Sequence, residues 1–176
     1  AGPLAPQAQE IFETALMQAI EDGCAEDAVM ASSQREFQAL WDMRDGCADY
    51  VRTLPHAASG DISVPVKRIP AFLAESQEAL RLIDPGIIFL AFGHMGDGNL
   101  HYVFSTPQKA QAMERLLTLV AEYGGSVSAE HGIGVDKKPW LHLSRDAAQI
   151  ATMRLLKSAL DPRGILNPGR IFDMPA

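Results

Sequence analysis

Residues 86–104, GIIFLAFGHMGDGNLHYVF, decide the fold of this chain. Two apolar runs flank a glycine-rich centre, which is the pattern of two strands joined by a tight turn. The dipeptide Asp97-Gly98 suits the two-residue loop of a type I′ turn, and such a loop pairs position 94 with position 101. We therefore predict an antiparallel hairpin in which His94 and His101 are direct cross-strand neighbours on one face.

The rest of the chain alternates helical and extended patterns around this hairpin. Apolar residues at helical spacing predict helices over 11–20, 33–44, 70–82, 110–123 and 144–160. Short apolar or alternating stretches predict strands over 27–31, 61–66, 86–92, 100–104 and 126–129. Such interleaving predicts an α+β fold, with a ferredoxin-like antiparallel sheet, helices packed on one face, and a C-terminal helix and tail.

Composition bounds the domain count and the class of partner. The chain has 176 residues, of which 47% are apolar and 21% charged, and at about 150 residues per domain we expect one domain over residues 1–176. The net charge of -7, without any basic run, argues against nucleic-acid binding through phosphate neutralisation. No apolar stretch reaches the ~20 residues needed to span a bilayer. We expect no transmembrane segment.

Cysteine usage and the first residues indicate the cellular context. Cys24 and Cys47 are too few for a disulfide framework, so we expect free thiols in a reducing cytoplasm. The chain starts without Met and with a proline-rich segment, Ala1 to Pro6. This start predicts that the sequence is the tail of a longer chain.

Two clusters carry the candidate chemistry. Directly paired histidines would have Cβ atoms ~4.5–5.5 Å apart, close enough for His94 and His101 to bind one cation. Glu130 and His131 follow the last expected strand, and glycines at 132 and 134 let the backbone leave the strand there. Glu130 would complete a His-His-Glu set, and His131 suits general-base work. The alternatives are a hairpin with incidental histidines and a surface Glu-His pair.

Arg44 shares a helix face with three apolar residues and is expected to point inward. A buried arginine needs either an internal carboxylate or an anionic ligand, which its planar group grips bidentately. Spacing alone thus predicts a small-anion site with a divalent metal, a base and an arginine, but no particular reaction. The sequence contains no nucleophile elbow, phosphate loop or dinucleotide fingerprint.

Several motifs, in order along the chain, resemble the C-terminal domain of the FAD-linked oxidases. These are the vanillyl-alcohol-oxidase-type flavoproteins, which include D-lactate and D-2-hydroxyglutarate dehydrogenases and the glycolate oxidase flavin subunit. The matching stretches are Trp41-x-x-Arg44, Asp61-Ile-Ser-Val-Pro65, Gly93-His-Met-Gly-Asp-Gly-Asn-Leu-His101, Ser128-Ala-Glu-His-Gly-Ile-Gly134 with Lys137, and Ala159-Leu-Asp-Pro-Arg-Gly-Ile-Leu-Asn-Pro-Gly169.

The resemblance implies a function for these residues. A divalent metal, Zn or Mn, would be held by His94, His101 and Glu130. Arg44 would grip the substrate carboxylate, and His131 would take the hydroxyl proton of a D-2-hydroxy acid. The reaction implied is oxidation to the 2-oxo acid, with hydride transfer to FAD.

The resemblance also implies partners and limits. In that family this domain caps a separate N-terminal FAD-binding domain, which the present sequence does not contain. Asn167 would lie near the flavin, and the fragment alone is expected to be inactive. Ala48 and Val103 stand where the 2-hydroxyglutarate branch has polar residues, which favours a shorter or more apolar substrate. A metal-dependent hydrolase and a structural metal-binding domain remain alternatives, and the electron acceptor is not specified.

Overall fold

The computed structural model describes residues 5–94 and 96–174. The chain divides into two compact units, Ala1–Asp49 and Tyr50–Ala176, which we describe separately. The prediction of one domain over residues 1–176 stays a prediction. In the described part of the chain, no helix is long and apolar enough to cross a membrane.

The first unit contains helix α1 (Ala5–Glu21) and most of α2 (Gln34–Thr53). The predicted start of this helix at residue 33 agrees with the structure, in which Ser33 Oγ accepts the backbone N–H of Glu36 at 3.2 Å as an N-terminal cap. The predicted strand over 27–31 is wrong, since this stretch has no strand hydrogen bonds. An extended segment becomes a strand only beside another strand, and α1 and α2 offer none.

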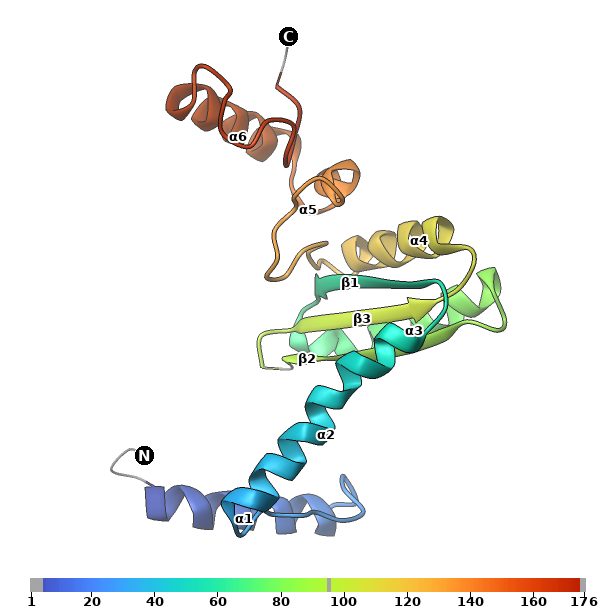
Figure 1. The fold of residues 1–176 in the computed structure, drawn as a ribbon, viewed down its shortest axis with the longest axis vertical. Helices are drawn as coiled ribbons and strands as arrows, with labels where there is room; N and C mark the ends of the chain where they lie inside the picture. The colour runs from blue at the N-terminus through green and yellow to red at the C-terminus, as the bar shows by residue number, and fades with distance from the viewer. Residues whose placement is uncertain (1–4, 95, 175–176) are drawn as a thin grey trace. The chain divides into compact units, whose positions relative to one another are not determined.

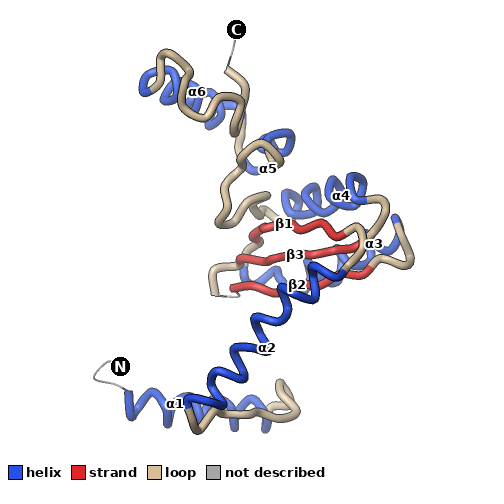
Figure 2. The backbone as a smooth tube through the Cα atoms, viewed as in Figure 1, coloured by secondary structure: helices blue, strands red, loops and turns tan. Residues whose placement is uncertain are grey.

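The second unit is built on a three-stranded antiparallel sheet of order β1-β3-β2 (Figures 1 and 2). Its strands are β1 (Ala57–Ser63), β2 (Ile88–His94) and β3 (Asn99–Ser105). Helices α3 (Ile69–Ile83) and α4 (Lys109–Glu122) pack on one face of the sheet. The predicted α+β class, with helices on one face, is confirmed.

The core lies between this sheet and its two helices. Alternate strand residues point into it, and both helices bury one apolar face there. Phe72 packs edge-on against two tyrosine rings, with centroids 6.3 Å from Tyr102 and 5.4 Å from Tyr123. The fully buried side chains include Ile62, Phe72, Leu80, Tyr102, Phe104, Leu116 and Val120. The opposite face of the sheet is left to other residues, and it carries the candidate site.

Two predicted strands differ in extent from those observed. The strand expected at 61–66 ends at Ser63, because Pro65 lacks a donor and Val66–Arg68 forms a short 3-10 helix. The strand expected at 126–129 is reduced to a bridge between Ser63 and Ser126. This bridge still places the segment after α4 beside the outer edge of β1.

The C-terminal part contains a 3-10 turn (Lys138–Trp140), α5 (Leu141–Ser144) and α6 (Ala147–Leu160). Asp146, not Ser144, caps α6 and forms a capping box with Gln149. The hydroxyl of Ser144 instead accepts the backbone N–H of Val127 at 2.9 Å. The predicted end of this helix at Asp161 is confirmed.

The hairpin has a different register from the one predicted. His94 pairs with Asn99, and Phe92 pairs with His101, so the connection has four residues instead of two. A type I′ turn needs a positive φ at both central residues, but of Asp97 and Gly98 only the glycine has one, at 78°. The Asp97 side chain instead accepts the backbone N–H of Asn99 at 3.0 Å. This two-residue shift keeps both histidines on one face, because strand side chains alternate with a period of two.

Candidate functional site

The candidate site occupies the sheet face that α3 and α4 leave open. The side chains of Asp61 on β1 and His101 on β3 are cross-strand partners there, and Phe92 on β2 pairs with His101 from the other side. His94 and Asn99 lie at the turn end of the same face. Three strands thus bring polar groups to one place, at the end of the sheet where the hairpin turns.

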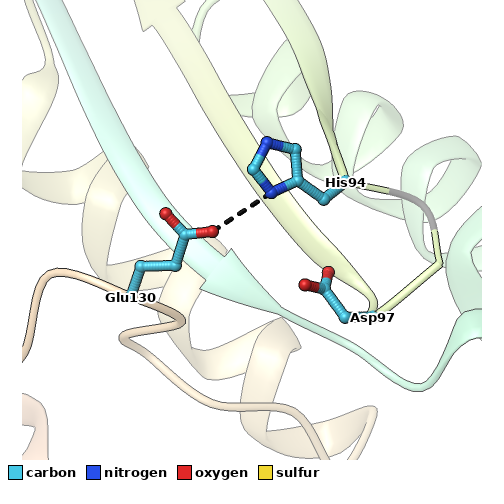
Figure 3. Close-up of side chains that lie close together, drawn as sticks. All are labelled: His94, Asp97 and Glu130. Atoms are coloured by element: carbon cyan, nitrogen blue, oxygen red, sulfur yellow. Dashed lines mark ion pairs between the residues drawn. The ribbon is translucent and has the colours of Figure 1, made fainter. Parts of the chain in front are cut away.

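Among the described residues, His94, Asp97 and Glu130 form a group of possible metal ligands (Figure 3). One ligand atom from each residue lies within 4.8 Å of the others. His94 Nδ1 is 3.2 Å from Glu130 Oε1, and Asn99 donates its side-chain N–H to the same oxygen at 2.5 Å. The structure therefore brings His94 and Glu130 together, although 36 positions of sequence separate 94 from 130. Sequence reasoning missed Asp97 because it was assigned to the turn alone.

His101 lies beside this group without belonging to it. Its ring centroid is 5.9 Å from that of His94 and 6.2 Å from that of His131. Its Nδ1 faces Asp61 Oδ1 at 3.9 Å. The prediction that His101 is a third metal ligand stays a prediction, and Asp97 is the third candidate that the geometry supplies.

Asp61 is a buried carboxylate in the middle of the site, 7% exposed. Its Oδ2 accepts the backbone N–H groups of Glu130 and His131, each at 3.0 Å, and lies 3.6 Å from Lys137 Nζ. Burial alone would raise the pKa of Asp61, but these two hydrogen bonds and Lys137 outweigh burial and hold the pKa below its ordinary value. Burial lowers the pKa of Lys137 despite the attraction of Asp61.

Glu130 and His131 project to one side because the backbone leaves the strand direction after Ala129. Ala129 still donates its N–H to the carbonyl of Asp61 at 3.2 Å. The chain then bends, and Gly132 takes a φ of 71° that favours glycine. His131 Nδ1 consequently lies 3.7 Å from Asp61 Oδ2, on the same side as Glu130. The departure from the strand that the glycines predicted is confirmed.

A pocket of about 420 Å³ adjoins the imidazole of His131. Asp61, Lys137 and Arg170 also line it, together with the glycine-containing segment 132–136. The His131 side chain is 67% exposed, so its ring is accessible from this pocket. A small molecule entering here would meet an imidazole, the cationic side chains of Lys137 and Arg170, and the carboxylates of Asp61 and Asp136.

Arg44 belongs to the first unit and is described there alone. Its side chain is 61% exposed, and its guanidinium pairs with Asp45 at 2.9 Å and lies 5.8 Å from the centroid of the Trp41 ring. The expectation that it points inward is wrong within this unit, because Phe37 and Leu40 on the same face are also exposed. Its proposed grip on a substrate carboxylate is not tested by this geometry.

The remaining predicted residues lie as follows. Asn167 is exposed in the C-terminal tail with a φ of 48°, and its contact with flavin stays a prediction. Cys24 is a free, exposed thiol as expected. Val103 is 3% exposed on β3. The side chains of Cys47 and Ala48 lie outside the described residues.

The residues present fit a divalent cation. An imidazole nitrogen and two carboxylates are ligands that Zn and Mn accept. Within the described residues, Asp61 Oδ1 and Asn99 Oδ1 are buried side-chain oxygens without a hydrogen-bond partner, and both lie at this site. Unsatisfied buried oxygens are costly and indicate that a further group belongs there.

Comparison with known proteins agrees with these motifs. The sequence profile described as FAD linked oxidases, C-terminal domain, matches residues 1–171. The chain is 37% identical over 180 residues to the D-2-hydroxyglutarate dehydrogenase of Stutzerimonas stutzeri, with 96% of this chain and 37% of that protein covered. It is 38% identical over 177 residues to the protein of the same name from Xanthomonas citri pv. viticola, with 94% and 36% covered. A putative mitochondrial D-lactate dehydrogenase of Schizosaccharomyces pombe is 34% identical over 166 residues, with 85% and 31% covered. The chain thus spans about a third of the length of these relatives.

Proposed function

This chain belongs to the family of FAD-linked oxidase C-terminal domains, and from that premise we propose that it is the substrate- and metal-binding domain of an FAD-dependent D-2-hydroxy acid dehydrogenase. The observation that carries the proposal is the convergence of His94, Glu130 and His131 on one open sheet face. The relatives named as dehydrogenases of 2-hydroxy acids support it. An FAD-binding domain in the same full-length chain is the proposed partner.

We propose that His94 and Glu130 hold a divalent cation, Zn or Mn, together with His101 as the sequence predicts. Asp97 lies close enough to serve as a further ligand. When bound, the cation would supply Lewis acidity toward the hydroxyl and carboxylate oxygens of the substrate, and flavin would supply the hydride acceptor.

The chain's own residues have distinct tasks in this proposal. The exposed imidazole of His131 accepts the hydroxyl proton, and the Cα hydrogen leaves the substrate as hydride, so the 2-hydroxy acid becomes the 2-oxo acid. Arg44 grips the substrate carboxylate through its two-pronged guanidinium. Asn167 faces the flavin. We propose that this domain is active only together with an FAD-binding domain.

The proposed substrate is a short or apolar D-2-hydroxy acid. Phe92 lies beside His101, with ring centroids 5.5 Å apart, and Val103 follows His101 by two positions on the same face of β3; both are apolar. Neither residue offers a positive charge to a second carboxylate on the substrate. The proposed compartment is the cytoplasm, in keeping with the free thiol of Cys24.

The test is anaerobic mixing of the naturally occurring full-length protein with D-2-hydroxy acids, recorded as bleaching of the flavin absorbance. Reduction by D-lactate or D-2-hydroxybutyrate, and not by the L-enantiomers, is the expected result. Full-length protein that binds no flavin, or that hydrolyses esters without flavin, would overturn the proposal and favour the hydrolase alternative.

A further inference from the structure

Asp61 connects the two halves of the candidate site. It lies on β1, 69 residues before Glu130 and 70 before His131, and contacts both. Its side chain is almost fully buried, which for a carboxylate is unfavourable without specific partners. A group of this kind inside a functional site needs a physical account.

One oxygen of Asp61 fixes the backbone of the second half. Oδ2 accepts the consecutive N–H groups of Glu130 and His131, both at 3.0 Å. Consecutive residues of a regular strand point to opposite faces. Binding both amides to one oxygen holds the backbone in a bend, and this bend presents the two side chains on one side.

The other oxygen faces the first half. Oδ1 is buried, has no hydrogen-bond partner among the described residues and lies 3.9 Å from His101 Nδ1. Asp61 and His101 are also paired across β1 and β3. At this distance the carboxylate acts on the imidazole through its charge. A metal-ligating histidine commonly donates its other ring N–H to a carboxylate, and Asp61 Oδ1 is the carboxylate oxygen that faces His101 Nδ1.

Lys137 offsets the buried negative charge of Asp61 and also contacts the segment that contains Ser128. Its Nζ is 3.6 Å from Asp61 Oδ2 and donates to the Asp61 carbonyl at 2.9 Å and to Ser128 Oγ at 3.1 Å. The ammonium thereby links β1 to the segment that leads into Glu130. The whole arrangement has one centre, the Asp61 carboxylate.

We propose that Asp61 is the positioning residue of this site, whose carboxylate anchors the Glu130-His131 backbone and orients the imidazole of His101. The inference rests on the proposed function for its consequence in catalysis, but the anchoring itself is a property of the fold. Asp61 touches no reacting atom in this scheme. It acts through the three residues that it holds.

The first experiment measures the anchor without reference to metal or activity. Backbone amide exchange is followed by mass spectrometry over residues 128–134 in the full-length protein and in Asp61→Ala and Asp61→Asn. Asparagine keeps an oxygen that can accept both amides, whereas alanine does not. We expect exchange about tenfold faster in Asp61→Ala and within about twofold of the parent in Asp61→Asn. Unchanged exchange in Asp61→Ala would refute the anchoring role.

The second experiment measures the effect of the charge on the imidazole. Zn²⁺ affinity is determined by competition with a chromophoric chelator, alongside kcat and KM for the best substrate. Asp61→Asn is expected to lose about 10–100-fold in Zn²⁺ affinity and to lower kcat more than it raises KM. Zn²⁺ affinity within about twofold of the parent would refute the orienting role.

Asp84→Asn is the matched control. Asp84 is a partly buried carboxylate of the same unit that also accepts two hydrogen bonds, from Gly86 N at 2.9 Å and Thr106 Oγ1 at 2.6 Å. Unlike Asp61, it forms no ion pair with a histidine among the described residues. It should lose stability without losing Zn²⁺ affinity, and equal losses in both variants would overturn the proposal. Failure of the parent protein to bind Zn²⁺ would refute the orienting role and the metal part of the proposed function, while amide exchange still decides the anchor.

Discussion

Replacement of Gly125 by alanine should detach the second half of the site from the sheet. Gly125 ends the turn after α4, where its N–H binds the carbonyl of Val120 at 2.8 Å. A Cβ at this position would lie 2.1 Å from the backbone oxygen of Ser63 and 2.9 Å from Val120 Cγ1. A backbone oxygen cannot rotate away, so the segment that begins at Ser126 must move off β1.

The cost can be worked out from the contacts that are lost. Moving the segment breaks the two hydrogen bonds between Ser63 and Ser126, of 3.0 and 2.9 Å, each with a net contribution of about 0.5–1.5 kcal/mol. Overpacking against Val120 adds about 1–3 kcal/mol. We expect the free energy of unfolding to fall by about 4 kcal/mol in Gly125→Ala.

Gly124→Ala is the neighbouring control, because this glycine is constrained for a different reason. Gly124 has a φ of 70°, but a Cβ at this position would meet no other atom within 4 Å. Only the left-handed backbone conformation opposes alanine there, at about 1–2 kcal/mol.

Guanidinium unfolding followed by circular dichroism measures both losses, and Zn²⁺ competition reports on the site. We expect Gly125→Ala to weaken Zn²⁺ binding and Gly124→Ala to leave it unchanged. Equal destabilisation of the two variants, or unaltered Zn²⁺ binding in Gly125→Ala, would show that the Ser63–Ser126 contact does not position Glu130.

Further predictions concern the chemistry and its pH dependence. His131→Gln should lower kcat by about 10²–10⁴-fold while Zn²⁺ content, measured by atomic emission, stays within error; His94→Ala should lower both. The depressed pKa of Asp61 contributes stability that is fully present above its ordinary pKa of about 3.9 and is lost as the pH falls through the lower folded-state value. Acid unfolding curves of Asp61→Asn should therefore lack part of the low-pH loss seen in the parent, and identical curves would contradict this assignment. In steady-state assays, kcat/KM for D-2-hydroxybutyrate should exceed that for D-2-hydroxyglutarate at least about tenfold; the reverse order would refute the apolar substrate class.

The sequence predicted the hairpin and the shared face of its histidines, but not its register. The prediction that both histidines share one face is correct because the predicted pairing differs from the observed one by two residues, an even number. The register itself depends on Asp97, whose side chain binds the N–H of Asn99 and extends the turn. Such a bond is one of several that an aspartate can make near a turn, and the sequence does not select among them.

Asp61 belongs to the motif Asp61-Ile-Ser-Val-Pro65, but the sequence alone indicates no role for it. Its position was informative, because Ile62 beside it suits a strand, and a carboxylate that is buried in a strand needs partners. Those partners are 69 and 70 residues away. Local periodicity carries no information on which distant backbone amides will meet a given side chain.

The span of the Asp61–Glu130 contact has a kinetic consequence. The hairpin that carries the histidines closes through a connection of four residues, and such loops form within about 1–10 μs. The carboxylate and its amides must instead close a loop of 69 positions, which chain entropy makes slower. During refolding, the imidazoles of His94 and His101 should therefore come together before Glu130 joins them. Binding of the cation would then mark the end of folding and not its beginning.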